Sequence, residues 1–113
     1  MTAGEIYLAN FPFGEGGGGK IRPVLLLTGP IGSVPEVLVA YVSSVLPPQL
    51  LPSDIVLDPQ AADHASTNLK TASVLRLHKL ATIHRKSVVR LLGAISSRTQ
   101  SDVETKLRAL LNL

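Results

Sequence analysis

Residues 14–27 read Gly-Glu-Gly-Gly-Gly-Gly-Lys-Ile-Arg-Pro-Val-Leu-Leu-Leu, and this stretch decides which fold the chain can adopt. It nearly matches the phosphate-binding loop G-x-x-x-x-G-K-[ST], with Gly14, Gly19 and Lys20 in register. The match fails at Ile21, where that loop needs a hydroxyl group to reach the metal ion. It fails again downstream, because a phosphate-binding loop opens a helix, whereas a proline followed by aliphatic residues is typical of the start of a strand. The glycines are therefore expected to join two β-strands.

The composition indicates one globular domain, residues 1–113. Hydrophobic residues make up 45% of the chain, which argues against disorder. Aromatic residues make up only 4%, which argues against an RNA-binding sheet that stacks bases on aromatic rings. The chain has no cysteine, and this excludes disulfides, thiol catalysis and cysteine-ligated zinc. No apolar run is long enough to span a membrane and the N-terminus does not resemble a signal peptide, so we expect a cytoplasmic protein.

Runs rich in β-forming residues, separated by glycine- and proline-containing turns, predict a mainly β fold. The expected strands cover residues 5–11, 22–28, 36–44, 53–57, 73–83 and 87–95. The last of them could instead begin as a short helical turn, and another helical turn is expected at residues 60–64. The strand at 73–83 alternates, which predicts Leu77, Lys79 and Ala81 on one face and Arg76 and His78 on the other.

A C-terminal helix is predicted by an apolar stripe at positions i, i+4, i+7 and i+8. The stripe consists of Val103, Leu107, Leu110 and Leu111. Ser96 or Ser97 could cap the beginning of this helix, and so could a capping box that begins at Ser101. Together, these strands and the helix predict a small, mostly antiparallel β-barrel or curled sheet with a C-terminal helix packed on it.

Positive charge is unevenly distributed along the chain. The formal net charge is +3, and no Asp or Glu occurs between Asp63 and Asp102. That interval carries seven basic residues: Lys70, Arg76, Lys79, Arg85, Lys86, Arg90 and Arg98. Such an asymmetry is typical of a protein with a polyanionic partner, but also of a solvated basic face that balances an acidic one. Charge alone does not separate the two interpretations.

Several short motifs, taken in order, resemble the MazF/PemK family of toxin endoribonucleases. The segment Gly4-Glu-Ile-Tyr-Leu-Ala-Asn-Phe, the glycine-rich loop and Arg22-Pro23 with its aliphatic strand resemble the opening of that family. Residues 37–44, Val-Leu-Val-Ala-Tyr-Val-Ser-Ser, resemble its third strand. Residues 73–83 resemble its Ser-Val-x-x-Leu-Asp-Gln-Leu-x-Thr-Ile segment, and residues 90–96 with the terminal helix resemble its closing segment.

The resemblance, which spans nearly the whole chain, implies a fold, an activity and partners. The implied fold is a small SH3-like β-barrel of the MazF/Kid/CcdB type with a C-terminal helix, assembled as a homodimer. The implied activity is metal-independent, sequence-selective cleavage of single-stranded RNA without a cofactor, by attack of the ribose 2′-hydroxyl on the adjacent phosphorus. The implied partner is a cognate antitoxin whose disordered tail lies in the active-site groove.

Two residues match the family's catalytic positions. Arg22 matches the catalytic arginine, and a guanidinium suits that role because it stays charged and forks onto two phosphate oxygens. Ser43 matches the position of an active-site threonine whose hydroxyl can donate a hydrogen bond to the scissile phosphate. Ser44 is the alternative one residue later, and only one of the two serines can face the site, because side chains alternate along a strand.

Other residues are expected at the rim of the site or in contact with RNA. Lys20 is a candidate rim contact. The candidate contacts to the phosphate backbone are Lys70, Arg76, Lys79, Arg85 and Lys86. The chain departs from the family at His78-Lys79, where the family tends to have Asp-Gln, so His78 could act as a general base or lie as a polar surface residue. Glu15 could orient the arginine, act as a base or be a solvated loop residue. The three histidines show no metal-ligand spacing with carboxylates, so no metal is expected.

The departures keep a second interpretation open. A non-catalytic member of the same fold could bind a protein target, as the gyrase-poisoning toxins do, or bind RNA without cutting it. His78, Lys79 and His84 motivate this alternative, because they replace residues at positions that contact RNA or the second subunit in the family.

Overall fold

The computed structural model of the protein describes residues 1–10 and 20–113. The predicted glycine loop, with Glu15, therefore lies outside the described residues. The described chain forms six strands, two short 3₁₀ helices and one α-helix. In chain order they are β1 (Glu5–Asn10), β2 (Ile21–Leu26), β3 (Glu36–Ser43), β4 (Asp54–Leu57), η1 (Ala62–Thr67), β5 (Ser73–His84), η2 (Arg85–Ser87), β6 (Val88–Ala94) and α1 (Ser97–Leu111).

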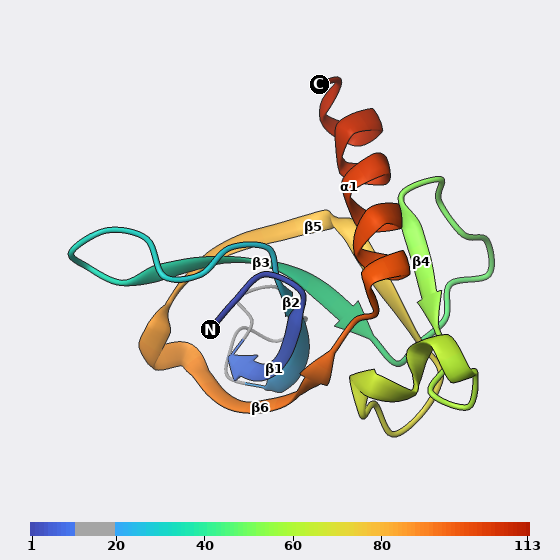
Figure 1. Ribbon diagram of the computed structural model, residues 1–113, viewed down its shortest axis with the longest axis horizontal. Helices are drawn as coiled ribbons and strands as arrows, with labels where there is room; N and C mark the ends of the chain where they lie inside the picture. The colour runs from blue at the N-terminus through green and yellow to red at the C-terminus, as the bar shows by residue number, and fades with distance from the viewer. Residues whose placement is uncertain (11–19) are drawn as a thin grey trace.

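All six strands belong to one antiparallel sheet in the order β4-β5-β3-β2-β1-β6. The sheet curls strongly, and β6 runs beneath β1 and β2 while α1 stands over β5 (Figure 1). The predicted six strands are confirmed with ends shifted by one or two residues. The region predicted as a strand or a helical turn contains both, because η2 leads directly into β6. The helical turn expected at residues 60–64 lies slightly later, as η1.

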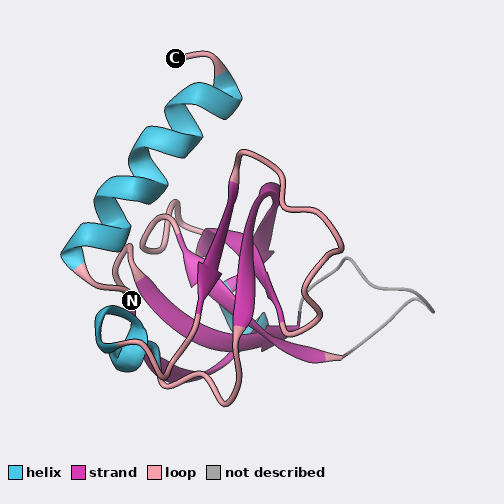
Figure 2. Ribbon diagram, turned by 90° about the vertical axis from the view of Figure 1, so that its right-hand side faces the viewer, coloured by secondary structure: helices cyan, strands magenta, loops and turns pink. Residues whose placement is uncertain are grey.

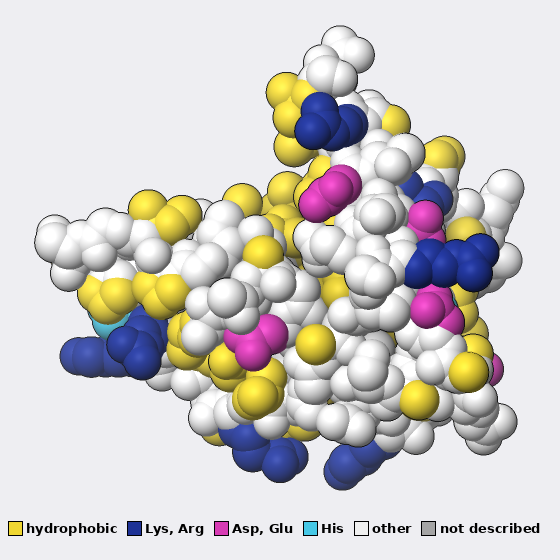
Figure 3. Space-filling model, viewed as in Figure 1, with side chains coloured by type: hydrophobic (Ala, Val, Ile, Leu, Met, Phe, Trp, Pro, Cys, Tyr) yellow, Lys and Arg dark blue, Asp and Glu magenta, His cyan; other side chains and the backbone are white. Residues whose placement is uncertain are grey.

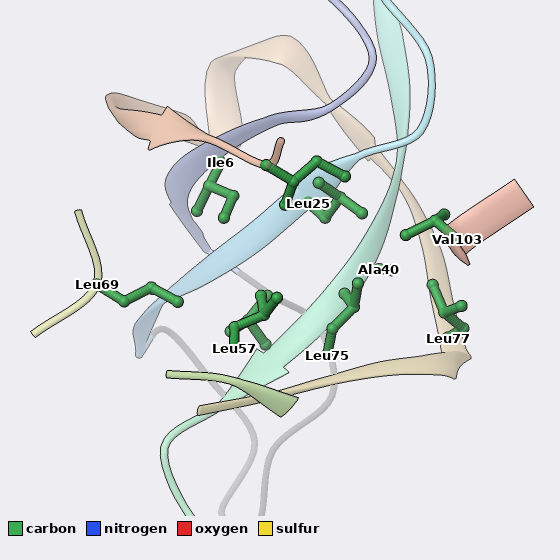
Figure 4. Close-up of a cluster of buried hydrophobic side chains, with 10 residues drawn as sticks. Ile6, Leu25, Ala40, Leu57, Leu69, Leu75, Leu77 and Val103 are labelled. Carbon is green, nitrogen blue, oxygen red and sulfur yellow. The ribbon is translucent and has the colours of Figure 1, made fainter. Parts of the chain in front are cut away.

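One face of the curled sheet encloses an apolar cluster together with α1, and we call it the helix-side cluster (Figure 4). Every strand and the helix contribute to it, which explains why so small a chain can exclude water from its centre. Its fully buried members, which supply most of the hydrophobic stabilisation, are Ile6, Leu25, Ala40, Val42, Leu57, Leu75, Leu77 and Val103.

The opposite face of the sheet buries a second cluster over β1, β2, β3 and β5. This cluster contains Tyr7, Ala9, Val24, Leu26, Val37, Val39, Ala81 and Ile83. The sheet is thus buried on both faces over much of its area. This explains why β2 and β3 are continuous apolar runs rather than alternating ones.

The pairing of β3 with β5 contains a register shift that corrects one prediction. Ala40 pairs with Leu80, but the next residue, Tyr41, pairs with Arg76. The extra residues of β5 form a bulge, which reverses the alternation beyond it. Leu77 and Leu80 therefore both pack on the helix-side cluster. The prediction that Leu77 and Ala81 share a face is wrong, because Ala81 belongs to the second cluster.

The helix α1 begins after Ser96, whose side chain accepts a hydrogen bond from the backbone N–H of Thr99 at 3.1 Å. This selects Ser96 from the three predicted caps. Only the first half of the predicted stripe is covered by the sheet: Val103 is 1% exposed, whereas Leu111 is 52% exposed. The C-terminal half of α1 extends beyond the sheet in both views (Figures 1 and 2). None of the helices in residues 1–10 and 20–113 has the length and apolar character needed to cross a membrane.

The end of η1 and the residue that follows it are fixed against the edge strand β6. Ser66 donates a side-chain hydrogen bond to the carbonyl of Ala94 at 2.8 Å, and the side-chain amide of Asn68 donates one to the carbonyl of Leu92 at 2.7 Å. Asn68 itself adopts the left-handed conformation, with φ of 55°. The contact is close because Gly93 lacks a side chain: a Cβ there would lie 2.2 Å from the carbonyl oxygen of Ser66.

We expect Gly93→Ala to destabilise the protein by roughly 1–3 kcal/mol, the usual cost of overpacking. The neighbouring atoms are backbone, so η1 has to move away from β6 to accept the methyl group. Urea unfolding monitored by circular dichroism measures the change in the free energy of unfolding. Val89→Ala is a matched control, because Val89 lies on the same strand and is 52% exposed. An unfolding midpoint of Gly93→Ala equal to that of the wild type contradicts the expectation.

Candidate functional site

The structure brings Arg22 and Ser43 to neighbouring strands on one face of the sheet. Arg22 pairs with Ala9 of β1, which belongs to the second cluster, so the arginine points to that face. The pairing of β2 with β3 runs through Val24 opposite Tyr41. The same register, continued by two residues, sets Arg22 opposite Ser43, at the end of the sheet where β2 begins and β3 ends.

The hydroxyl of Ser43 is largely buried and engaged in a local turn. Its oxygen accepts a hydrogen bond from the backbone N–H of Val45 at 3.1 Å, and the hydroxyl donates to the carbonyl of Val45 at 3.3 Å. The donated hydrogen bond is long and therefore weak. The hydroxyl can therefore turn at small cost and donate its hydrogen bond to a better acceptor. Ser44 points the other way and lines a separate pocket with Pro23. Of the two serines, Ser43 is therefore the one on the face of Arg22.

Two cations lie beside Tyr41 on this same face. The guanidinium carbon of Arg22 is 5.9 Å from the centroid of the Tyr41 ring, and the ammonium nitrogen of Lys79 is 5.5 Å from it. Such distances are those of cation–π contacts. Within residues 1–10 and 20–113 the ion pairs join the N-terminus to Glu5 and Arg76 to Asp54. In that part of the chain Arg22 and Lys79 thus have no carboxylate partner, which makes their surroundings favourable for an anion.

Arg76, a predicted RNA contact, is held in an ion pair with Asp54 of β4. The two residues are opposite each other in the β4–β5 ladder, and the guanidinium donates two hydrogen bonds to the carboxylate, at 3.2 and 3.3 Å. The carboxylate also accepts a hydrogen bond from the backbone N–H of Leu51 at 2.8 Å, and its side chain is 0% exposed. Arg76 therefore neutralises a buried charge. Asp54 was missed in the sequence, where nothing shows that it faces a residue 22 positions later.

His78 and Lys79 both lie in the bulge of β5, and their side chains have different surroundings. Lys79 points to Tyr41, whereas His78 lines a mostly apolar pocket between α1 and the loop before β4, together with Leu51 and Leu110. His78 is exposed, but desolvation by its neighbours there, followed by the nearby charge of Arg76, lowers its pKa below the ordinary value of 6.5. His78 is thus not on the face of Arg22 and Ser43.

Lys20 is exposed and immediately precedes β2, two residues before Arg22. The third departure from the family, His84, uses its ring locally: its Nδ1 accepts a hydrogen bond from the backbone N–H of Lys86 at 2.9 Å. Across the described residues, no three His, Asp or Glu side chains come close enough to hold a metal ion. The arrangement of Arg22, Ser43 and Lys79 can bind and polarise a phosphate group, since it combines two cations with a hydroxyl donor.

Comparison with known proteins gives a consistent assignment. Residues 2–111 match the sequence profile of a family described as "PemK-like, MazF-like toxin of type II toxin-antitoxin system". No curated protein sequence matches the chain.

Three solved structures with the same fold come from mycobacteria. The Mycobacterium tuberculosis toxin MazF-mt6 is 21% identical, with a TM-score of 0.72 over 96% of this chain and 97% of its own. An endoribonuclease in complex with its cognate antitoxin, from Mycobacterial species, is 14% identical, with a TM-score of 0.71 over 100% of this chain and 96% of its own. A further mycobacterial endoribonuclease is 15% identical, with a TM-score of 0.69 over 100% and 92%. At these identities the likeness concerns the fold, which is the mainly β fold with a C-terminal helix of MazF-type toxins.

We expect Asp54→Ala to lower the free energy of unfolding by about 3 kcal/mol, because it leaves the guanidinium of Arg76 without its carboxylate. Arg76→Ala should cost a similar amount, and the double variant less than the sum of the two, because the residues form one unit. Urea unfolding measures all three variants. Lys79→Ala is the control, a cation with no carboxylate partner in the described structure. Additive effects of the two single variants would show that the pair does not act as a unit.

The lowered pKa of His78 predicts a pH dependence of stability. The folded protein favours the neutral imidazole of His78. The contribution of His78 to the free energy of unfolding is therefore complete above about pH 6.5, the ordinary pKa. It is lost as the pH falls through the lower pKa of the folded state. An NMR titration of the imidazole signals measures the pKa directly. Between pH 6.5 and the lower pKa of the folded state, the free energy of unfolding of His78→Gln should depend less on pH than that of the wild type. A pKa of His78 at or above 6.5 contradicts the expectation.

Proposed function

Because the chain belongs to the PemK-like, MazF-like family of toxins of type II toxin–antitoxin systems, we propose that it cleaves single-stranded RNA without a metal ion. The observation that carries the proposal is the placement of Arg22 and Ser43 on adjacent strands of one sheet face, with Lys79 beside them. An RNA phosphate is the anion that this arrangement fits best.

The reaction we propose is a transesterification within the RNA strand. The ribose 2′-oxygen forms a bond to the adjacent phosphorus, the bond from phosphorus to the 5′-oxygen breaks, and a 2′,3′-cyclic phosphate and a 5′-hydroxyl result. Negative charge grows on the phosphorane oxygens, where a fixed guanidinium such as that of Arg22 stabilises it. DNA lacks the 2′-hydroxyl and cannot follow this route.

The remaining roles follow from the positions of the side chains. The hydroxyl of Ser43 donates a hydrogen bond to a phosphate oxygen in place of its long hydrogen bond to the carbonyl of Val45. Lys79 adds positive charge at the ring of Tyr41. His78 points toward α1 and does not serve as the base in this proposal. Glu15 remains the candidate acceptor of the 2′-proton, and it lies outside the described residues.

The proposal includes the partners expected of such a toxin. A protein antitoxin would cover the site of Arg22, Ser43 and Lys79. One of the solved structures with this fold is an endoribonuclease in complex with its cognate antitoxin. We further propose that the protein acts in the cytoplasm, where its RNA substrate lies, and assembles as a homodimer. Light scattering of the purified chain measures the assembly state.

The test is cleavage of a long single-stranded RNA in EDTA, with the new 5′-hydroxyl ends detected by ligation. We expect Arg22→Ala to lower the rate by about 10²–10³, as the loss of one transition-state contact does elsewhere. Arg98→Ala, which removes an exposed arginine on α1, should cut as fast as the wild type.

The proposal fails if the wild-type protein leaves RNA intact in EDTA, or if Arg22→Ala cuts at the wild-type rate. Intact RNA combined with recovery of gyrase in a pull-down would instead support the non-catalytic alternative. DNA of the same sequence serves as the substrate control.

A further inference from the structure

A second site lies on the helix-side face of the sheet, at the same end as Arg22 and Ser43. It is a pocket of about 530 Å³, which is within the usual range for sites that bind small ligands. Its apolar wall is aliphatic, with Leu69 and Leu92 continuing the helix-side cluster. Its lining residues are Leu8, Pro23, Ser44, Asn68, Leu69, Lys70, Thr71, Ser73, Arg90, Leu91 and Leu92.

The rim of this pocket is positively charged. Lys70 and Arg90 both line it and both are exposed, and no carboxylate in the described part of the chain does so. The ion pairs of the described residues include neither cation. On the face drawn in Figure 3, Lys and Arg side chains gather along the lower edge of the molecule, where Figure 1 places β6. A ligand in the pocket would therefore gain from carrying negative charge.

The rim also offers neutral hydrogen-bonding groups of both kinds. The side-chain amide nitrogen of Asn68 donates a hydrogen bond to the carbonyl of Leu92. This bond holds the side chain in place and leaves its oxygen to accept a hydrogen bond from a ligand. Ser44 and Thr71 add hydroxyl groups that can donate or accept. This mixture above an aliphatic floor suits a flat heterocycle with donors and acceptors on its edge.

The pocket and the face of Arg22 are the two sides of the same pair of strands. Arg22 and Pro23 are consecutive, as are Ser43 and Ser44, and consecutive residues of a strand point to opposite faces. Arg22 and Ser43 thus lie on one face, while Pro23 and Ser44 line the pocket on the other. The two sites therefore lie at the same end of these strands, on opposite faces of the sheet.

We propose that this pocket holds a ribonucleotide of the RNA next to the one whose phosphate is cleaved, with the base against the aliphatic floor and the phosphate at Lys70 and Arg90. The inference rests on the proposed function, and it deepens it by naming residues that set the sequence preference. The alternative occupant is an acidic peptide with an aliphatic anchor. The nucleotide is favoured because the pocket adjoins the phosphate site and its rim can read a base edge.

The first experiment maps cleavage preference with a randomised single-stranded RNA pool and sequencing of the 5′-hydroxyl ends. Thr71→Val removes one hydroxyl at constant size, and Arg90→Gln removes one charge. In the double variant we expect at least a tenfold loss of base discrimination at one position flanking the cut bond. Arg90→Gln alone should raise KM severalfold at low salt and leave kcat nearly unchanged, because it removes a contact made equally by substrate and transition state.

Matched controls separate this result from a general loss of fold. Thr105→Val and Arg98→Gln make the same chemical changes at exposed positions of α1 that do not line the pocket. They should keep the wild-type profile. If the double variant cuts RNA with the wild-type profile at every position, the subsite proposal is overturned while the proposed cleavage stands.

The second experiment tests binding without cleavage, so its outcome does not depend on activity. The four nucleoside 5′-monophosphates are titrated into the isotope-labelled wild-type protein and the double variant. We expect NMR shifts at Leu69, Thr71 and Leu92 in the wild type and at least tenfold weaker binding in the variant. No shift at these residues with any nucleotide, or shifts produced only by an acidic leucine-containing peptide, overturns the proposal. Should the wild type cut no RNA, the proposed function fails and this titration alone decides the pocket.

Discussion

The register shift between β3 and β5 is the constraint on which the rest of the structure depends. These two strands make the most extensive pairing in the sheet, and the shift lies in its middle, between Ala40 and Tyr41. Before the bulge, β5 sends its leucines to the helix-side cluster, and beyond it β5 sends Ala81 and Ile83 to the second cluster. One strand thereby serves two cores. Without the bulge, Leu75, Leu77, Ala81 and Ile83 would all point to the same face of the sheet.

The same bulge distributes the polar side chains of β5. Arg76 remains opposite Asp54, where a buried carboxylate requires it, and His78 is directed to the apolar pocket beside α1. Lys79 is turned to the ring of Tyr41 and thus to the neighbourhood of Arg22. Arg76, His78 and Lys79 therefore have three different surroundings, although they lie within four residues of each other. Packing of the two apolar clusters thus decides which of these basic side chains has no carboxylate partner among the described residues.

The sequence predicted the strands well because each is a compact β-forming run between turn residues. Short motifs pointed to Arg22 and Ser43, which the strand register places on one face of the sheet, and their catalytic role is part of the proposed function. It did not predict the bulge, because the alternation in residues 73–83 continues unbroken along the chain while the pairing partner shifts. It also did not reveal the pair of Asp54 and Arg76. Both depend on register between distant strands, which a single sequence does not contain.

The interval between Asp63 and Asp102, which contains no Asp or Glu, shows that the number of charges is a weaker guide to function than their positions in the fold. Its seven basic residues look equivalent in the sequence, yet Arg76 neutralises a buried carboxylate and Arg98 lies on α1. Lys79 joins Arg22 at Tyr41, whereas Lys70 and Arg90 border the pocket on the other face. The fold thus divides one basic segment between two surfaces: Lys79 of β5 lies on one of them, and Lys70 of the loop before β5 and Arg90 of β6 lie on the other. A single extended polyanion is the ligand that can use both surfaces at once, since a small anion reaches only one of them.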